Sequence, residues 1–160
     1  MLDLVNLDER LKEWGEMVIG KIRRNMETTG TNASGRSSAS LEVVITDTGL
    51  EIVGRRWFQG VEQGRPGGKI PYKFNEIIRK WMDEKGIAEN FGKTEAEKRS
   101  AAWHISQFIK EHGTKLHRDG GRDDIFTAVF DEEVPKLEAE IKSEVEKMIV
   151  TRINKAATEK

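Results

Sequence analysis

A short segment rich in glycine and proline, residues 60–71, constrains the fold of this chain more than any other feature. It holds four of the fifteen glycines and two of the three prolines. Glycine permits backbone conformations that other residues avoid, and proline fixes its own φ angle, so a segment dense in both follows a prescribed path. A β-rich run precedes it and an amphipathic helix follows it. We therefore expect a shaped loop on a rigid support, which is a common way to build a binding or assembly surface.

The composition indicates one charged globular domain. Of the 160 residues, 36% are hydrophobic and 34% are charged, and the formal net charge is -1. A chain of this length can bury one sizeable core, whereas two domains would each be marginally stable, so we expect a single α+β domain over residues 1–160. The near-zero net charge gives no general attraction to nucleic acid or to anionic lipid.

Three further features limit the compartment and the chemistry. No apolar run approaches the roughly 18 residues that cross a bilayer, so we expect no membrane partner. The first ten residues lack the basic start and the small-residue cleavage site of a secretory signal. Cysteine is absent, which excludes disulfides and thiolate chemistry.

Hydrophobic periodicity predicts a helix followed by a hairpin. Apolar residues recur at steps of three and four over residues 4–26, which predicts a long N-terminal helix. Residues 28–40 are small and polar, so we expect a mobile loop there. Two β-branched runs, residues 41–46 and 50–53, flank Asp47-Thr48-Gly49, and this pattern predicts an antiparallel hairpin.

The second half of the chain is expected to be helical. One helix is predicted over residues 72–85, and a second begins at Thr94 with a capping box completed by Glu97. After a second mobile loop over residues 113–122, Asp123 can cap a last apolar helical region. Because proline lacks an N–H, we expect this region to break or kink near Pro135, with a new helix starting there.

The expected fold is therefore α+β. It has a long N-terminal helix, an antiparallel β-hairpin sheet, and three or four further helices packed on it, including a long C-terminal helical region broken near Pro135.

Candidate catalytic and metal sites are weak. The three histidines, His104, His112 and His117, lack the spacing of a zinc or iron site, so surface histidines are the better interpretation. Residues 67–69 read Gly-Gly-Lys, but the phosphate-loop pattern fails because Gln63 stands where its first glycine should be. We expect no metal and no cofactor.

Two sets of carboxylates have both a possible chemical role and a structural one. Glu62 could serve as a buried general base, and Asp119, Asp123 and Asp124 could bind a divalent cation. A glutamate after a strand more often pairs with arginine or caps backbone amides, and paired aspartates before a helix more often serve its N-terminus. The structural interpretation is favoured for both sets, which leaves an enzyme as the third choice of function.

A nucleic-acid-binding role is the alternative hypothesis. Basic residues interleaved with aromatics can hold phosphates and stack on bases. The residues are Arg55, Arg56, Arg65, Lys69 and Lys73 near Trp57, Phe58 and Tyr72, with Lys115, Arg118 and Arg122 in a second loop. The net charge and the lack of a DNA-reading helix make this the less favoured interpretation.

The order of several short motifs resembles a known family. In chain order these are a small-residue loop with Gly35-Arg36 and Ser40-Leu41, a hairpin, Val61-Glu62-x-Gly64-Arg65-Pro66-Gly67, Pro71, a helix with Trp81 and Lys85-Gly86-Ile87, Ala102-Trp103-x-Ile105-x-x-x-Ile109, and Gly113-Thr114. This order, over about residues 1–150, resembles the tail-completion proteins, also called neck or minor tail proteins, of long-tailed bacteriophages.

The resemblance implies a structural virion protein with no enzymatic activity. Such a protein forms a homo-oligomeric ring in the phage neck, joins the head-connector protein to the tail-tube protein, and surrounds the genomic DNA without reading its sequence. It would be assembled in the host cytoplasm and end in the virion. We expect subunit and partner contacts from the loops, and the candidate interface residues are Trp57, Phe58, Glu62, Arg65, Pro66, Arg118 and Arg122.

Overall fold

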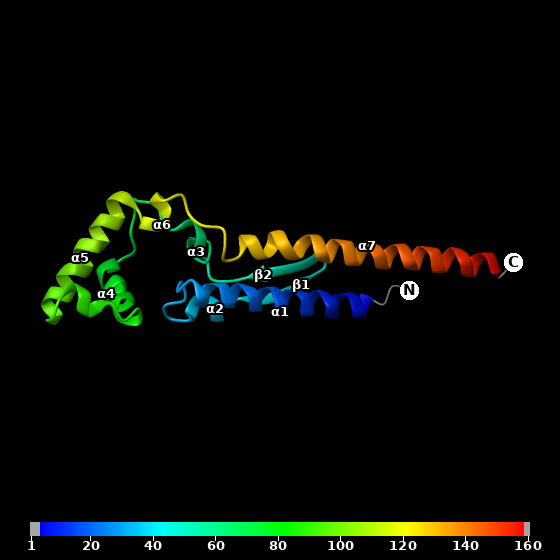
Figure 1. The fold of residues 1–160 in the computed structure, drawn as a ribbon, viewed down its shortest axis with the longest axis horizontal. Coiled ribbons are helices and arrows are strands. Elements are labelled where there is room, and N and C mark those ends of the chain that lie inside the picture. Colours follow the sequence, from blue (N-terminus) through cyan, green and yellow to red (C-terminus); the bar gives the residue numbers. More distant parts are fainter. Residues whose placement is uncertain (1–3, 159–160) are drawn as a thin grey trace.

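The computed structural model describes residues 4–158, which form two groups of elements side by side (Figure 1). The elements are α1 (Leu4–Thr28), α2 (Arg36–Ala39), β1 (Glu42–Thr46), β2 (Gly49–Val53), α3 (Gly60–Gln63), α4 (Phe74–Glu84), the 3-10 helix η1 (Ala88–Phe91), α5 (Glu95–His112), α6 (Lys115–Arg118) and α7 (Thr127–Thr158). One group holds α1, the hairpin and α7, and the other holds α4, η1 and α5. The α+β class expected from the sequence is confirmed.

The first group is built on the apolar stripe of α1. Its buried core joins the second half of that helix to Leu41 and to the start of the last helix, and consists of Val18, Ile19, Ile22, Met26, Leu41, Ile125 and Val129. The three- and four-residue spacing along α1 places its members on one face, as the sequence predicts.

The hairpin lies against the same helix. Strands β1 and β2 pair antiparallel with Val43 opposite Ile52 and Ile45 opposite Leu50, and these residues form the less exposed face. A Cβ atom added to Gly15 would lie 2.8 Å from Val43, so the glycine allows the sheet to approach the helix closely. The predicted hairpin is therefore confirmed, and Gly15 has a packing role.

Helices α1 and α7 run antiparallel, and Figure 1 shows them side by side. Ion pairs join them at two levels: Arg10 contacts Glu144, and Lys21 Nζ lies 2.7 Å from Glu133 Oε1. Hydrogen bonds from Lys136 and from Lys21 lower the pKa of Glu133 to about 2. These pairs fix the register of the two helices.

The predicted break at Pro135 is wrong, because α7 runs through this residue without interruption. Proline removes one hydrogen bond within the helix. Two ion pairs span the position, since Lys136 Nζ lies 2.6 Å from Glu132 and 2.7 Å from Glu133. Buried Val129 precedes the proline, so packing against α1 and these ion pairs hold the helix through it.

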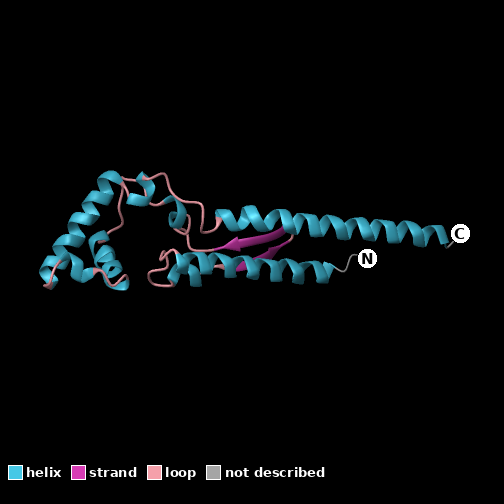
Figure 2. Ribbon diagram, viewed as in Figure 1, coloured by secondary structure: helices cyan, strands magenta, loops and turns pink. Residues whose placement is uncertain are grey.

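The second group has its own apolar core. Ile78 and Met82 of α4 pack against Ala88 of η1 and Ala102 of α5. An ion pair also joins α4 to α5, since Arg79 Nη2 lies 2.8 Å from Glu95 Oε2. We expected all helices to pack on the hairpin, and that expectation is wrong for α4 and α5, which pack mainly against each other (Figure 2).

Short helices occupy the two loops in which we expected mobility. Helix α2 lies in residues 28–40, where Arg23 donates from Nε to the carbonyl of Ser38 at 3.0 Å. Helix α6 lies in residues 113–122, where the Thr114 side chain accepts a hydrogen bond from the His117 amide. The mobility of these loops stays a prediction. None of the helices described here is long and apolar enough to cross a membrane.

Candidate functional site

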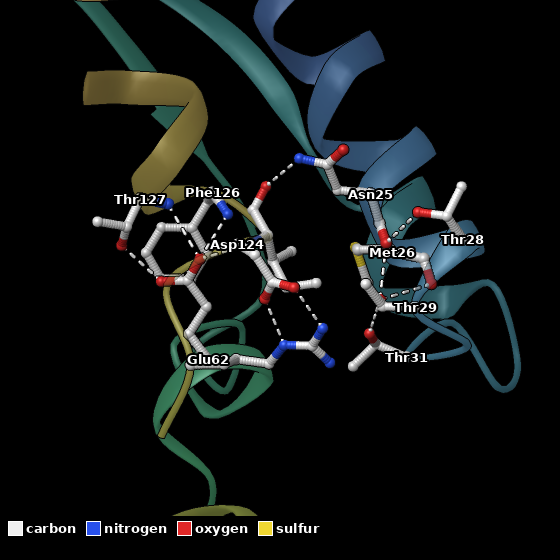
Figure 3. A network of polar contacts seen from close by, with 11 residues as sticks. Asn25, Met26, Thr28, Thr29, Thr31, Glu62, Asp124, Phe126 and Thr127 are labelled. Atoms are coloured by element: carbon white, nitrogen blue, oxygen red, sulfur yellow. Dashed lines mark hydrogen bonds and ion pairs between the residues drawn. The ribbon is translucent and has the colours of Figure 1, made fainter. Parts of the chain in front are cut away.

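The buried carboxylate of Glu62 caps the N-terminus of α7 (Figure 3). Helix α3 carries this side chain, which is only 3% exposed. Its Oε1 atom accepts hydrogen bonds from the amides of Ile125, Phe126 and Thr127 at 2.9, 2.6 and 3.0 Å. Its Oε2 atom accepts from the Thr127 hydroxyl at 2.5 Å. The negative charge thus meets free amides and the positive end of the helix dipole, so the residue has a structural role.

The two aspartates before α7 do not cap it. Asp124 instead binds Arg122, whose Nε and Nη2 atoms donate to the carboxylate at 2.5 and 2.7 Å. These bonds lower the pKa of Asp124 and raise the pKa of Arg122. The predicted capping role of Asp123 is wrong because the cap comes from α3, and Asp123 contributes only its carbonyl oxygen, which accepts from the Ala128 amide.

A backbone contact joins the loop after α3 to the end of α5. The Thr114 amide donates to the Arg65 carbonyl at 2.9 Å, and the Arg65 amide donates back to the Thr114 hydroxyl at 2.9 Å. The Gly68 amide donates to the Lys110 carbonyl at 2.7 Å. We call this region, residues 62–68 against residues 110–122, the junction.

Glycines allow the two chain segments of the junction to touch. A Cβ atom at Gly64 would lie 2.5 Å from the His117 amide nitrogen, and one at Gly67 would lie 2.8 Å from the Glu111 carbonyl oxygen. Such distances are shorter than real Cβ contacts, so a side chain at either position would push the segments apart. The glycine-rich loop therefore serves a close backbone approach.

The side chain of Arg65 lies inside the junction as well. Its guanidinium stands over the Phe74 ring at 5.3 Å and donates to the Lys69 carbonyl. The contact links the loop to the first residue of α4, so the arginine fixes the path of residues 65–74. The Arg65 residue is half-buried.

The structure separates the predicted interface residues into two kinds. Trp57 is 63% exposed, and Pro66 and Arg118 are also exposed, so these three can meet a partner. Phe58 packs against Phe126 of the first core at 5.6 Å between ring centroids. Neighbouring side chains leave Phe58 half-buried, so only part of its ring is open to a partner, and its place in an interface stays a prediction.

The other predicted interface residues hold the chain together. Glu62 is buried, which contradicts its predicted place on an interface, since its oxygens are committed to α7. Arg65 and Arg122 are half-buried and bonded within the chain. The structure brings all three into the junction, with the Arg122 amide donating to the Glu62 carbonyl at 2.9 Å.

A shallow hollow lies beside the junction. It has a volume of about 340 Å³. Its lining is Thr31, Trp57, Gly60, Val61, Gly64, Arg65, Thr114 and Leu116. Exposed Trp57 stands at this hollow, so a partner side chain could enter next to the indole ring.

Sequence reasoning missed two exposed aromatic residues on α5. Trp103 and Phe108 are both about half exposed. Trp103 meets His104 edge to face at 5.0 Å, and the Arg118 guanidinium stands over Phe108 at 4.9 Å. The apolar residues Ala101, Ala102, Ile105, Phe108 and Ile109 recur at helical spacing, which predicts that Phe108 lies on the apolar face. Trp103 falls between the members of that face, and this spacing was the signal that could have marked it as exposed.

The histidines lie on the surface of the second group and the junction. His112 packs its ring on Phe108, and His117 Nδ1 lies 3.3 Å from the Gln63 carbonyl oxygen. Within residues 4–158, no three histidine or acidic side chains converge as they would around a metal ion.

The comparisons with known proteins give no relative. The chain matches no family model, no curated protein and no solved structure.

Proposed function

We propose that this chain is a structural subunit of the phage neck, of the tail-completion type, and has no enzymatic activity. Copies of it form a ring that joins the head-connector protein to the tail-tube protein, with genomic DNA passing through without sequence-specific contacts. The resemblance described from the sequence is the source of the proposal. The contact between distant parts of that motif series is the observation that supports it.

Two of the motifs that carry the resemblance meet in the junction. The string Val61-Glu62-x-Gly64-Arg65-Pro66-Gly67 lies against Gly113-Thr114, although about 49 residues separate Arg65 from Thr114 in sequence. The residues make backbone hydrogen bonds, a helix cap and close glycine contacts. These contacts hold the two segments of the junction in one conformation, and a subunit that connects two partners in an assembly needs such a rigid region.

The exposed residues also suit an assembled subunit. Pro66 and Arg118 are exposed residues of the junction, and exposed Trp57 lines the hollow beside it. Tryptophan and arginine are frequent anchors of protein interfaces. In this proposal, the junction orients these residues, and neighbouring subunits or the connector and tail proteins cover them.

The mass of the free protein and its binding to tail-tube and connector proteins test the proposal. We expect a closed oligomer, either alone or after a partner is added, and we expect Trp57→Ala to weaken it. His104→Ala is the matched control, because this exposed ring lies on α5, away from the junction. A monodisperse monomer at high concentration that binds neither partner would refute the proposal.

A nucleic-acid-binding accessory protein is the second candidate, and one contact favours it. The Arg55 guanidinium stands over the exposed Trp57 ring at 5.5 Å, and Arg56 is exposed beside them. Such a group can hold a phosphate and a base together. DNA binding that falls steeply with salt and is lost in Arg55→Ala/Arg56→Ala would favour this candidate over a neck protein.

A further inference from the structure

The C-terminal half of α7 carries an apolar stripe that is left exposed by the elements the structure describes. Val145, Ile149 and Ile153 follow one another at four-residue steps, and Ile149 and Ile153 are 52% and 62% exposed. Residues at this spacing lie along one side of a helix. A run of β-branched residues on a helix of 32 residues is unusual for a surface that faces only water.

The register of the α1 and α7 pair explains why the stripe is exposed. The face of α7 that meets α1 carries Glu133 and Glu144, as their ion pairs with Lys21 and Arg10 show. Each residue turns the helix by about 100°, so Val145 points well away from the side that Glu144 shares with α1. The stripe therefore lies on a second face of α7, next to the face that packs against α1.

Charge is segregated along the same helix. Residues 131–146 hold seven acids and two bases, for a net charge of -5, whereas residues 147–158 hold three bases and no acid, for a net charge of +3. The acids are Asp131, Glu132, Glu133, Glu138, Glu140, Glu144 and Glu146, and the bases of the second stretch are Lys147, Arg152 and Lys155. The charges of α7 are therefore complementary to those of a second α7 helix that runs in the opposite direction.

We propose that the exposed stripe of α7 binds the α7 helix of a second copy of this chain, antiparallel and about a twofold axis close to Val145. This register places Ile141 opposite Ile149 and Glu138 opposite Arg152. It buries both stripes and brings the basic end of each helix to the acidic stretch of the other. A parallel pair in register would place acid against acid and base against base, so charge selects the antiparallel arrangement.

This inference does not depend on the proposed function. A twofold contact differs from the repeated head-to-tail contact that closes a ring. The chain could form the twofold pair alone in solution, or use it to join two rings. Loss of the α7 contact and loss of partner binding are therefore separate results.

Absence of cysteine makes a sharp cross-linking test possible, because any introduced thiol is the only one in the chain. Val145→Cys places a thiol close to the proposed axis, within disulfide reach of its own copy. Ala139→Cys is the control, since this exposed residue lies about 120° around the helix from Val145. Mild oxidation should convert most of the Val145→Cys protein to a disulfide dimer and leave the control mostly monomeric. Equal cross-linking of both, or of neither, would overturn the proposal.

Sedimentation of charge and stripe variants gives a second test. We expect Ile149→Asp to weaken the dimer at least tenfold, whereas Ile77→Asp, at a site on α4 that is 51% exposed, should leave it unchanged. Arg152→Glu and Glu138→Arg should each weaken the dimer, and the double variant should restore it. Circular dichroism checks that each variant keeps its helix content. A wild-type chain that stays monomeric, or a double variant weaker than both single ones, contradicts the antiparallel register.

Discussion

The Glu62 side chain satisfies several hydrogen-bond donors at the start of the long helix α7. Its carboxylate reaches from a four-residue helix to three amides at the start of α7. Without it, the buried Ile125 amide, the partly buried amides of Phe126 and Thr127, and the Thr127 hydroxyl would lose this acceptor. Hydrogen bonds to a charged group are stronger than neutral ones, and a buried donor left without a partner is destabilising.

We predict that Glu62→Ala lowers the free energy of unfolding by about 2–4 kcal/mol. Glu62→Gln should lose less, because its amide oxygen can still accept from one or two of the amides. Urea denaturation followed by circular dichroism measures both. Glu9→Ala, at an exposed glutamate of α1, is the control and should change the value by no more than about 0.5 kcal/mol. Equal stability of the Glu62→Ala and control variants would exclude a capping role.

Gly67 permits a second prediction at the residue scale. Gly67→Ala forces a Cβ atom to within 2.8 Å of the Glu111 carbonyl, so we expect a loss of about 1–3 kcal/mol in the free energy of unfolding. Gly20→Ala is the matched control, because a Cβ atom there would meet nothing within 4 Å. Since Gly20 lies inside α1, its replacement should stabilise the protein by about 0.5–1 kcal/mol. A neutral or stabilising Gly67→Ala would show that the two segments do not need their close approach.

Local sequence patterns indicated which residues have special roles, but they did not indicate which of these side chains are buried or what they contact. Trp57 and Phe58 are adjacent aromatics, and local pattern gives no reason to bury one and expose the other. Their exposures differ because Phe58 packs against Phe126, a residue almost 70 positions away in the chain. Glu62 was assigned a structural role correctly, but its partners at residues 125–127 depend on the same long-range contact.

At the scale of elements, local signals predicted α1, the hairpin and the start of α5. The capping box of Thr94 and Glu97 is present, and the Glu97 carboxylate accepts from the Thr94 amide at 2.9 Å. The start of α7 and its passage through Pro135 could not be predicted in this way. Both depend on side chains from elsewhere in the chain, Glu62 at the helix start and Lys21 beside the proline.

The contact between α1 and α7 should depend on pH through Glu133. Its pKa of about 2 is below the ordinary value of 4.5, because Lys136 and Lys21 donate hydrogen bonds to the ionised form. A carboxyl group whose pKa is lowered by folding stabilises the native state above the unfolded pKa. This contribution is lost as the pH falls from about 4.5 towards 2.

We therefore predict that the melting temperature of the wild-type protein falls more steeply than that of Glu133→Gln between pH 4.5 and pH 2.5. Glu16→Gln removes an exposed carboxylate of α1 and should follow the wild-type curve. Differential scanning fluorimetry across this pH range measures the difference. Parallel curves for the wild-type and Glu133→Gln proteins would contradict the ion-pair assignment.

At the scale of the whole molecule, the buried apolar residues form two separate clusters. The sequence could not reveal this division, because the periodicity of α4 and α5 shows that each helix has an apolar face without showing which element covers it. Polar and glycine residues of the junction connect the clusters, as the Arg65 and Thr114 hydrogen bonds show.

Hydrogen exchange can show whether the clusters open separately. Met82 is fully buried in the second cluster, so Met82→Ala should remove about 2–5 kcal/mol from the stability of α4 and α5. We predict a matching loss of amide protection in those helices and a much smaller loss in α1. Ile22→Ala, in the first cluster, should show the reverse distribution. Equal loss of protection in both clusters for either variant would mean that the molecule unfolds as one cooperative unit.

The hydrogen bonds between Arg65 and Thr114 bring together the two ends of the segment that holds α4, η1 and α5. The chain leaves the first group of elements at one point and returns to it at nearly the same point, since the Arg65 carbonyl and the Thr114 amide are 2.9 Å apart. The intervening α4, η1 and α5 therefore form a cassette, and the rest of the fold continues on both sides of it. Inserted units with adjacent ends are tolerated because removing or exchanging them leaves the host chain path intact. A short turn joining Gly64 to Lys115 would leave Glu62 within reach of α7, so this protein offers a natural site for grafting a foreign domain.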